Sequence, residues 1–266
     1  MERLQYLESE SIKILRSIPQ ICKKPAMLWS TGKDSTLVLH LQHKAFGSFP
    51  FPVIHIDTGK KFQEIYDFRD KIAKEWNLPL SIYRNELAQE LGLSCEKGLS
   101  KFECCTQLKT EALKIAIRER GFDALILSIR HDEHYVRGCE DIVSLRDSGG
   151  NWQWKSHFGG FGLTAPEHEG LAHLRVHPIL MWTEAEAWEY TMLHNLPVNP
   201  MYFSEDGLRY RSLGCEPCTE PIKSKATTIQ EIVNEVYMTP GLERSGRQQD
   251  KESKDTMLKL RQLGYM

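Results

Sequence analysis

Short apolar segments that alternate with longer amphipathic segments constrain the fold of this chain more than any other feature of its sequence. The apolar segments have the length of β-strands, and the segments between them carry apolar residues at helical spacing. Strands separated by helices of this length form right-handed crossovers and a parallel sheet. We therefore expect an α/β fold with a doubly wound parallel sheet. The expected strands are 26–29, 52–56, 80–83, 124–127 and 174–179, and the expected helices are 4–18 (ended by Pro19), 34–44, 61–76, 100–120, 183–194 and 228–237.

Two parts of the chain depart from this alternation. Residues 128–171 contain paired glycines, several histidines and two tryptophans without a regular period, which is typical of a long functional loop or of a disordered segment. Beyond residue 200 the chain continues with a cysteine-containing turn, one helix and a charged tail. We therefore divide the chain into an α/β domain over 1–200 and a C-terminal segment over 201–266.

The charge balance limits the classes of partner. The 266 residues include 34 Lys and Arg against 36 Asp and Glu, which gives a formal net charge of −2. This excludes a protein coated with basic residues for non-specific nucleic-acid binding, although a local basic groove is compatible with it. No apolar run approaches the ~18–20 residues that cross a bilayer, so we expect no membrane association.

The N-terminal residues 1–17 alternate charged and apolar side chains and lack the uninterrupted apolar stretch of a signal peptide. We therefore expect a cytoplasmic protein. Thiols stay reduced in that compartment, so the seven cysteines favour metal or redox roles over disulfides.

A polar loop with the sequence STGKDS, residues 30–35, separates the first expected strand from the next helix. Gly32 allows a tight turn, and the N-terminus of a helix is an anion site to which Lys33 adds a positive charge. The first glycine of the Walker pattern is missing, so the residues alone also fit an ordinary solvated helix start. The position directly after the first strand of an α/β unit favours phosphate binding.

The cysteines form two informative pairs, Cys104-Cys105 and Cys215-x-x-Cys218. The second spacing fits zinc, a redox pair or one corner of an iron–sulfur cluster. Adjacent helical residues project about 100° apart, so Cys104 and Cys105 reach one centre more easily if that centre is a cluster. Of the single cysteines, Cys95 and Cys139 remain alternatives to one of the four paired ones.

Other polar and aromatic residues near the segment 128–171 allow functional interpretations. Trp152 and Trp154 could stack on bases, but packing beneath a long loop is the more frequent role of such a pair. The acidic residues 132, 133 and 141 could bind magnesium or be solvated. The histidines at 131, 134, 157, 168, 173 and 177 match no zinc signature, which favours a polar loop.

Taken together, these motifs resemble those of the ATP pyrophosphatases, or adenine nucleotide alpha hydrolases. The similarity is strongest to the branch with the small subunit of sulfate adenylyltransferase and the phosphoadenylyl- and adenylyl-sulfate reductases. It runs from about residue 2 to the end of the sequence and is weakest between about 148 and 172. The segments that carry it are STGKDS at 30–35, VIHIDTG at 53–59, KFQE at 61–64, YDFR at 66–69, RHDE at 130–133 and ERSGR at 243–247.

This resemblance implies attack of an oxyanion on the α-phosphorus of ATP, with pyrophosphate as the leaving group. Lys33, Asp34 and Arg130 would be the catalytic residues, and Asp34 would be the link to Mg²⁺. Positioning and charge stabilisation would carry most of such a step. The implied ATP-binding residues are Ser30, Thr31, Gly32, Lys33, Asp34 and Ser35 for the pyrophosphate, His55, Ile56 and Asp57 for the adenosine, and Arg130, Arg244 and Arg247 for the phosphates.

The cysteines resemble those of the assimilatory adenylyl-sulfate reductases, including the context GCEPCT at 214–219. This similarity implies a [4Fe–4S] cluster on Cys104, Cys105, Cys215 and Cys218, with zinc as the second choice. The chain lacks the C-terminal cysteine with which those reductases attack sulfur. The adenylyltransferase subunits, in turn, typically lack the cluster cysteines.

A third branch combines these features, namely the ATP pyrophosphatases of bacterial DNA phosphorothioation systems of the Dnd and Ssp classes. Its pattern implies adenylylation of a DNA backbone phosphate for sulfur insertion, with a cysteine desulfurase and other phosphorothioation proteins as partners. A homodimer is compatible with this interpretation. The alternatives are a sulfate adenylyltransferase small subunit with a GTPase partner, or a non-catalytic desulfurase-docking module. The intact loop at 30–35 counts against the docking module.

Overall fold

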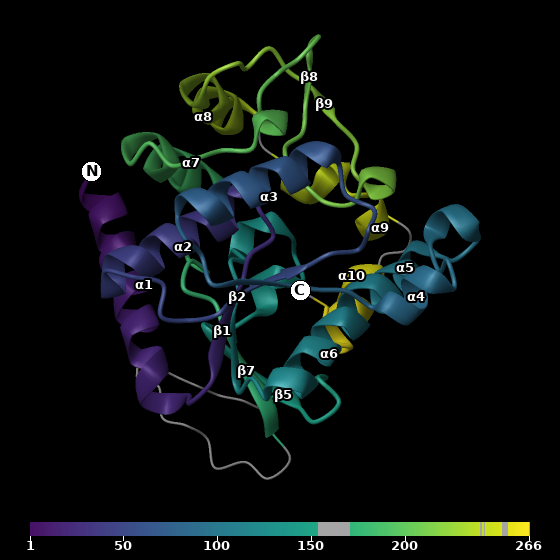
Figure 1. The fold of residues 1–266 in the computed structure, drawn as a ribbon. Coiled ribbons are helices and arrows are strands. Elements are labelled where there is room, and N and C mark those ends of the chain that lie inside the picture. The colour runs from purple at the N-terminus through teal and green to yellow at the C-terminus, as the bar shows by residue number, and fades with distance from the viewer. Residues whose placement is uncertain (154–170, 240, 242, 252–254, 266) are drawn as a thin grey trace.

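The computed structural model describes residues 1–266 except 154–170, 240, 242, 252–254 and 266 (Figure 1). Seven strands of the described chain form the central sheet: β1 (Pro25–Leu28), β2 (Val53–Ile56), β3 (Leu80–Tyr83), β4 (Ala124–Ile126), β5 (Val143–Asp147), β6 (Trp152–Gln153) and β7 (Leu171–Val176). Their order is β3-β2-β1-β4-β7-β5-β6. The first five strands in this order pair in parallel, whereas β5 is antiparallel to both β7 and β6. The predicted α/β class is confirmed.

Helices cover both faces of the sheet. The α-helices are α1 (Glu2–Ile21), α2 (Lys33–Phe46), α3 (Gln63–Glu75), α4 (Glu86–Glu90), α5 (Lys101–Cys105), α6 (Glu111–Arg120), α7 (Glu184–Leu193), α8 (Ile229–Met238), α9 (Gln248–Lys251) and α10 (Thr256–Gln262). Successive strand residues point to opposite faces, so Met27 joins a core with α1, α2, α3 and α7, whereas Ala26 and Leu28 join one with α6. None of the described helices is long and apolar enough to cross a membrane.

The sheet topology places the loops after β1, β2 and β4 at one edge. Strand β1 lies between β2 and β4, and its parallel neighbours all end at the same side. The chain first adds β2 and β3 on one side of β1 and then crosses to add β4 on the other side. The carboxyl end of β1 is therefore the switch point, where α/β proteins bind ligands. The loop 30–35, the residues after β2 and the segment around Arg130 therefore meet there.

Three sequence predictions need correction. The first helix continues through Pro19, which lies in its last turn. The predicted helix 100–120 is interrupted by a π-helical segment, η2 (Thr106–Thr110), between α5 and α6. Residues 128–171 are not irregular throughout, because they contain β5 and β6.

Strand β5 was hidden from the sequence pattern because its polar residues are buried. Ser144 and Arg146 are both enclosed, and each bonds to the carboxylate of Glu140. Trp152 is buried beneath the guanidinium groups of Arg146 and Arg261, as expected for a packing role. Positions 154, 157 and 168, which also entered the predictions, lie outside the described residues.

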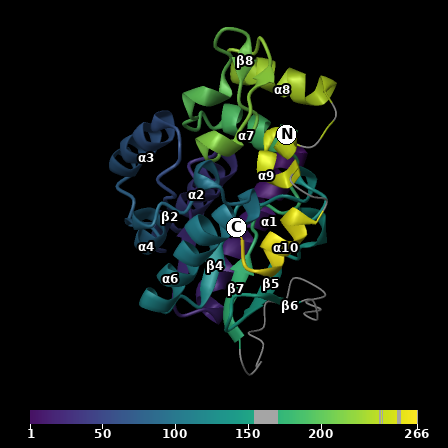
Figure 2. The ribbon, with the colours of Figure 1, turned by 90° about the vertical axis from the view of Figure 1, so that its right-hand side faces the viewer.

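The C-terminal segment folds back onto the sheet edge instead of forming a simple charged tail. Figure 2 shows α10, in yellow, next to β5, and Arg261 of α10 pairs with Glu140, which precedes that strand. Helices α9 and α10 both contact α5, and Met257 and Leu260 of α10 pack with Cys105. Helix α8 packs on α7, beside a small two-stranded sheet of β8 (Leu208–Arg209) and β9 (Ile222–Lys223). This return brings residues 243–247 to the carboxyl ends of the central strands.

Candidate active site

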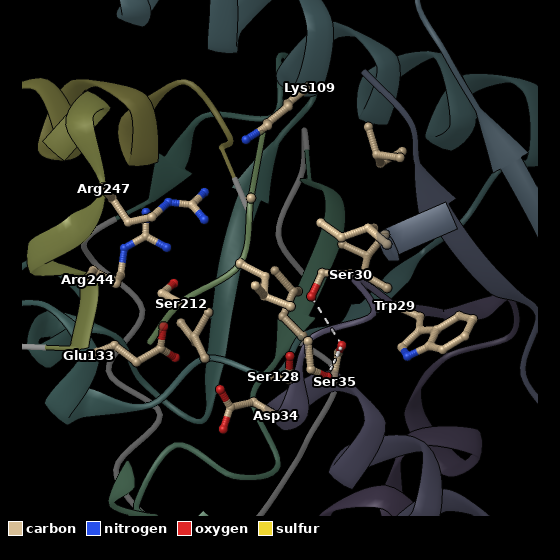
Figure 3. Close-up of a pocket in the computed structure, with 18 of the residues that line it drawn as sticks. Trp29, Ser30, Asp34, Ser35, Lys109, Ser128, Glu133, Ser212, Arg244 and Arg247 are labelled. Carbon is tan, nitrogen blue, oxygen red and sulfur yellow. Dashed lines mark hydrogen bonds between the residues drawn. The ribbon is translucent and has the colours of Figure 1, made fainter. Parts of the chain in front are cut away.

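A cavity of about 160 Å³ lies at the carboxyl ends of β1, β2 and β4. Figure 3 shows Ser30, Asp34 and Ser35 at one end and basic side chains at the other. The basic residues of that second end are Lys109, Arg244 and Arg247. The cavity therefore has a phosphate-loop end and a separate cationic end.

The phosphate-loop end is shaped by a tight turn. Thr31 adopts a left-handed φ of 69°, and Gly32 forms the N-cap of α2 without a side-chain cap bond. A Cβ on Gly32 would lie 3.2 Å from the hydroxyl of Tyr202, so a side chain here would crowd that contact. Ser30 and Ser35 face each other, with their hydroxyl oxygens 3.1 Å apart. First-turn amides of a helix favour bound anions, as the sequence predicted.

Lys33 and Arg130 form a buried ion-pair cluster behind this end of the cavity. The Lys33 Nζ atom lies 2.8 Å from Asp34 Oδ2 and 2.5 Å from Glu243 Oε1. Arg130 donates to the carboxylates of Asp34, Glu243 and Asp132. Burial alone would lower the pKa of Lys33, but Asp34 and Glu243 hold it above its ordinary value. The cluster fixes both cations in their charged forms.

The expected adenosine residues divide between the cavity and the protein interior. Ile56 lines the cavity, whereas His55 and Asp57 are not among the lining residues. Asp57 accepts hydrogen bonds from the Gly59 amide, the Tyr66 hydroxyl and Arg84. These bonds, with the complete burial of its side chain, give Asp57 a role in organising the turn after β2.

His55 supports a lysine that the sequence analysis missed. Its Nδ1 atom lies 2.9 Å from the Trp29 carbonyl, which can only accept, so Nε2 is the unprotonated nitrogen. Lys61 Nζ donates to that nitrogen at 2.7 Å and to the Ile56 carbonyl at 2.7 Å. Burial lowers the pKa of Lys61 to about 7, and Lys61 lines the cavity.

Five cysteines gather beside the cationic end. Burial raises the pKa of Cys218 to about 12, and the charges of Cys95, Cys105 and Cys215 act in the same direction. Burial also raises the pKa of Cys104 to about 12, and the charges of Cys95 and Cys105 add to this shift. The four paired cysteines and Cys95 of η1 (Cys95–Lys97) therefore lie near enough to affect one another's charge, and their role as cluster ligands stays a prediction.

Cys139 lies apart from this group. It is exposed on η4 (Arg137–Cys139), where its thiol contacts the Tyr135 carbonyl at 3.8 Å. Across the described ranges, no three His, Cys, Asp or Glu side chains are close enough together to hold one metal ion. The described thiols thus do not form a tetrahedral zinc site.

Cys215 is the member of the five-cysteine group that lines the cavity. It precedes the turn η6 (Glu216–Cys218) and lines the cavity, with its Sγ atom 3.3 Å from Thr58 Oγ1. Burial would raise the pKa of Cys215, but Lys109 and the Thr58 hydrogen bond lower it. The positive charges of Lys109 and Lys61 therefore stabilise negative charge at this position.

The two predicted C-terminal arginines both line the cavity. Arg244 lies in η7 (Glu243–Gly246) and is held by Asp250, with Nε 2.8 Å from Oδ2. Arg247 follows that turn, and its amide donates to the Arg244 carbonyl at 2.9 Å. Both side chains reach the cationic end from the C-terminal segment (Figure 3).

Four residues of the site were missed from sequence, namely Lys61, Lys109, Tyr202 and Glu243. Lys109 carried a usable signal, because it follows Cys105 by one helical turn and could be expected on the same face. Glu243 lies within the ERSGR segment, from which only the arginines were selected. Lys61 lies within the KFQE segment at 61–64, from which no site residue was predicted, and Tyr202 had no local signal.

The chain belongs to the phosphoadenosine phosphosulfate reductase domain family, which matches residues 24–221. Two curated relatives are named sulfate adenylyltransferase subunit 2. The protein from Proteus mirabilis (strain HI4320) is 36% identical over 305 residues, and the match covers 100% of this chain and 98% of the Proteus protein. That from Saccharophagus degradans (strain 2-40) is 36% identical over 301 residues, with the same coverage.

Solved structures agree with this fold. Phosphoadenylyl-sulfate reductase from Candida auris superposes with a TM-score of 0.58 at 19% identity, covering 83% of this chain and 97% of that chain. The FMN adenylyltransferase of Candida glabrata gives a TM-score of 0.56 at 17% identity, covering 83% and 64%. At these identities the likeness concerns the fold alone. The named relatives favour the sulfate adenylyltransferase alternative over the DNA phosphorothioation that we first expected.

Proposed function

We propose that this protein binds ATP and transfers its adenylyl group to sulfate, releasing pyrophosphate. The observation that carries the proposal is the cavity with two ends, one formed by the phosphate loop and one by Lys109, Arg244 and Arg247. The first end offers helix amides and hydroxyls to the phosphates of a nucleotide, and the second offers cations to another anion. The names of the full-length relatives support sulfate as that anion.

The reaction needs little covalent chemistry from the protein. A sulfate oxygen attacks the α-phosphorus, the bond between the α-phosphorus and the bridging oxygen breaks, and pyrophosphate leaves with that bridging oxygen. Catalysis then rests on positioning and on stabilising negative charge. The amides at the start of α2 and the hydroxyls of Ser30 and Ser35 would bind the leaving pyrophosphate.

Magnesium fits this end of the cavity. Asp34 lines the cavity with a carboxylate, and carboxylate oxygens together with phosphates are the usual ligands of Mg²⁺. The hydroxyl of Ser35 lies in the same first turn of α2. When bound, the ion would neutralise charge on the phosphates. Asp34 and Ser35 are therefore the residues that would hold it.

A variant of Lys33 tests the nucleotide part of the proposal. Lys33→Ala should abolish sulfate-dependent pyrophosphate release, because it removes a buried cation of the phosphate-loop end. Lys44→Ala is the matched control, since Lys44 lies in the same helix and forms an exposed pair with Glu8. Unchanged turnover in Lys33→Ala would contradict the site assignment. Because the relatives are named subunits, we also propose a partner subunit, a GTPase in the resemblance above.

A second candidate function follows from the cysteines. We propose that Cys104, Cys105, Cys215 and Cys218 hold a [4Fe–4S] cluster, with Cys95 as the alternative ligand. Four thiolates are the ligand set of such clusters, and they stand farther apart than the ligands of one ion. Lys61, Lys109 and Arg247 act electrostatically on Cys215, and their charge would offset that of the thiolates.

With such a cluster, the acceptor could be a DNA backbone phosphate, and sulfur from a cysteine desulfurase would then displace AMP. The two candidates differ in measurable ways. Anaerobic purification followed by iron and acid-labile sulfide analysis should give about four of each per chain. Both iron and sulfide should be lost in Cys215→Ser and retained in Cys139→Ser, since Cys139 is exposed and is not one of the proposed ligands. Pyrophosphate release that depends on DNA, and not on sulfate, would favour the second candidate.

A further inference from the structure

Glu243 separates the two buried cations of the site from the cavity. Its carboxylate lies 2.5 Å from Lys33 Nζ and also pairs with Arg130. The side chains of Lys33 and Arg130 are 0% exposed, and that of Glu243 is 5% exposed. Glu243 lines the cavity, whereas neither cation does. An anion entering the phosphate-loop end therefore meets a carboxylate before it meets a cation.

Every side-chain nitrogen of these two cations already contacts a carboxylate. All three nitrogens of Arg130 donate to carboxylates, namely those of Asp132, Asp34 and Glu243. Lys33 donates to two of the same carboxylates, Asp34 and Glu243. A pyrophosphate oxygen that approaches either cation also approaches these carboxylates, and charges of the same sign repel at contact distance. Replacement of one carboxylate removes that repulsion and leaves its donors to pyrophosphate.

Of the three carboxylates, Glu243 is the one most easily replaced. Asp34 is part of the first turn of α2, and Asp132 accepts the Glu184 amide at 2.7 Å. Glu243 belongs to the short turn η7 of the C-terminal segment, outside the central sheet. It also bridges both cations, so its departure frees one donor on each of them.

We propose that the Glu243 carboxylate occupies the pyrophosphate subsite of the free protein and is exchanged for pyrophosphate when ATP binds. This inference rests on the proposed nucleotide function and adds a regulatory element to it. The exchange couples occupancy of the phosphate-loop end to the position of η7 and of the arginines that follow Glu243. Pyrophosphate and Glu243 compete for Lys33 and Arg130.

The test compares the affinity of inorganic pyrophosphate for the full chain and for Glu243→Gln by calorimetry. Glutamine keeps the shape of the side chain and removes its charge. The variant should bind pyrophosphate about tenfold more tightly, or better, because the competing charge is gone. The matched control is Glu220→Gln, which weakens exposed contacts of the same C-terminal segment with Gln248 and Lys251. It should bind pyrophosphate as the unchanged protein does.

A second measurement uses the unchanged protein and does not depend on a variant folding. Pyrophosphate should accelerate hydrogen exchange at the amides of Arg247 and Glu220, which bond to the Arg244 and Gly246 carbonyls of η7. Equal pyrophosphate affinity in Glu243→Gln and the unchanged protein, or slower exchange in η7, would overturn this inference alone. Pyrophosphate binding to neither protein would overturn the proposed function and this inference with it.

Discussion

The guanidinium group of Arg247 lies in the space that a side chain on Gly214 would need. A Cβ built on Gly214 stands 2.0 Å from both terminal nitrogens of Arg247. Gly214 precedes Cys215, so the glycine allows an arginine from the C-terminal segment to pass directly over the cysteine turn. The cationic end of the cavity depends on this close approach.

Gly214→Ala should therefore displace Arg247 and reduce pyrophosphate release. We expect a loss of about 10- to 100-fold, the equivalent of one charge-assisted hydrogen bond. The new Cβ would contact only the end of the flexible Arg247 side chain, so the melting temperature should change little. The control is Gly138→Ala, where the nearest atom to the new Cβ is a carbonyl oxygen at 3.8 Å. Full activity in Gly214→Ala would show that Arg247 is dispensable.

Asp57→Asn distinguishes a structural role of this carboxylate from the adenosine contact that the resemblance implies. The buried carboxylate has charge-assisted partners in Arg84 and Tyr66, so the variant should lose about 1–3 kcal/mol of unfolding free energy. The KM for ATP should stay within about twofold at a temperature where the variant is folded. Urea unfolding and initial rates measure the two effects, with Asp67→Asn on the exposed face of α3 as the control. A raised KM with unchanged stability would restore the adenosine role.

The stability of the protein should fall as the pH drops below about 6.5. Burial lowers the pKa of His173 to about 2 and that of His177 to about 3. Between pH 6.5 and 3 the unfolded chain therefore binds protons that the folded protein does not, so folding free energy is lost as the pH falls. Each histidine should contribute up to about 1.4 kcal/mol per pH unit in this window.

His173→Phe isolates this effect. In the part of the chain that the structure describes, neither ring nitrogen of His173 has a hydrogen-bond partner. Phenylalanine keeps the ring and does not titrate, so the variant should become more stable than the parent as the pH falls from 7 to 5. Urea midpoints at both pH values measure the difference. A constant difference between the two proteins would contradict the shifted pKa.

What could be predicted from the sequence was local. The turn at 30–35 follows a strand and precedes a helix, so its place at the switch point could be predicted from the neighbouring residues alone. The pairing of Lys33 with Glu243 joins residues 210 positions apart, and no periodicity connects them. Lys61 and His55 are only six positions apart, but the significance of Lys61 arises from its contact with the buried imidazole, which no sequence period indicates. Strand β5 was missed because an arginine within it, Arg146, is buried. Arg146 and the distant Arg261 both pair with the carboxylate of Glu140.

The most direct test of the central claim is the product formed from ATP and radiolabelled sulfate, with and without the proposed partner subunit. The account predicts labelled adenylyl sulfate and pyrophosphate in equal amounts, both absent with Lys33→Ala and present with Lys44→Ala. Chromatography of the nucleotides and a coupled pyrophosphate assay measure the two products. Pyrophosphate release without labelled adenylyl sulfate, or no ATP turnover at all, would contradict adenylyl transfer to sulfate.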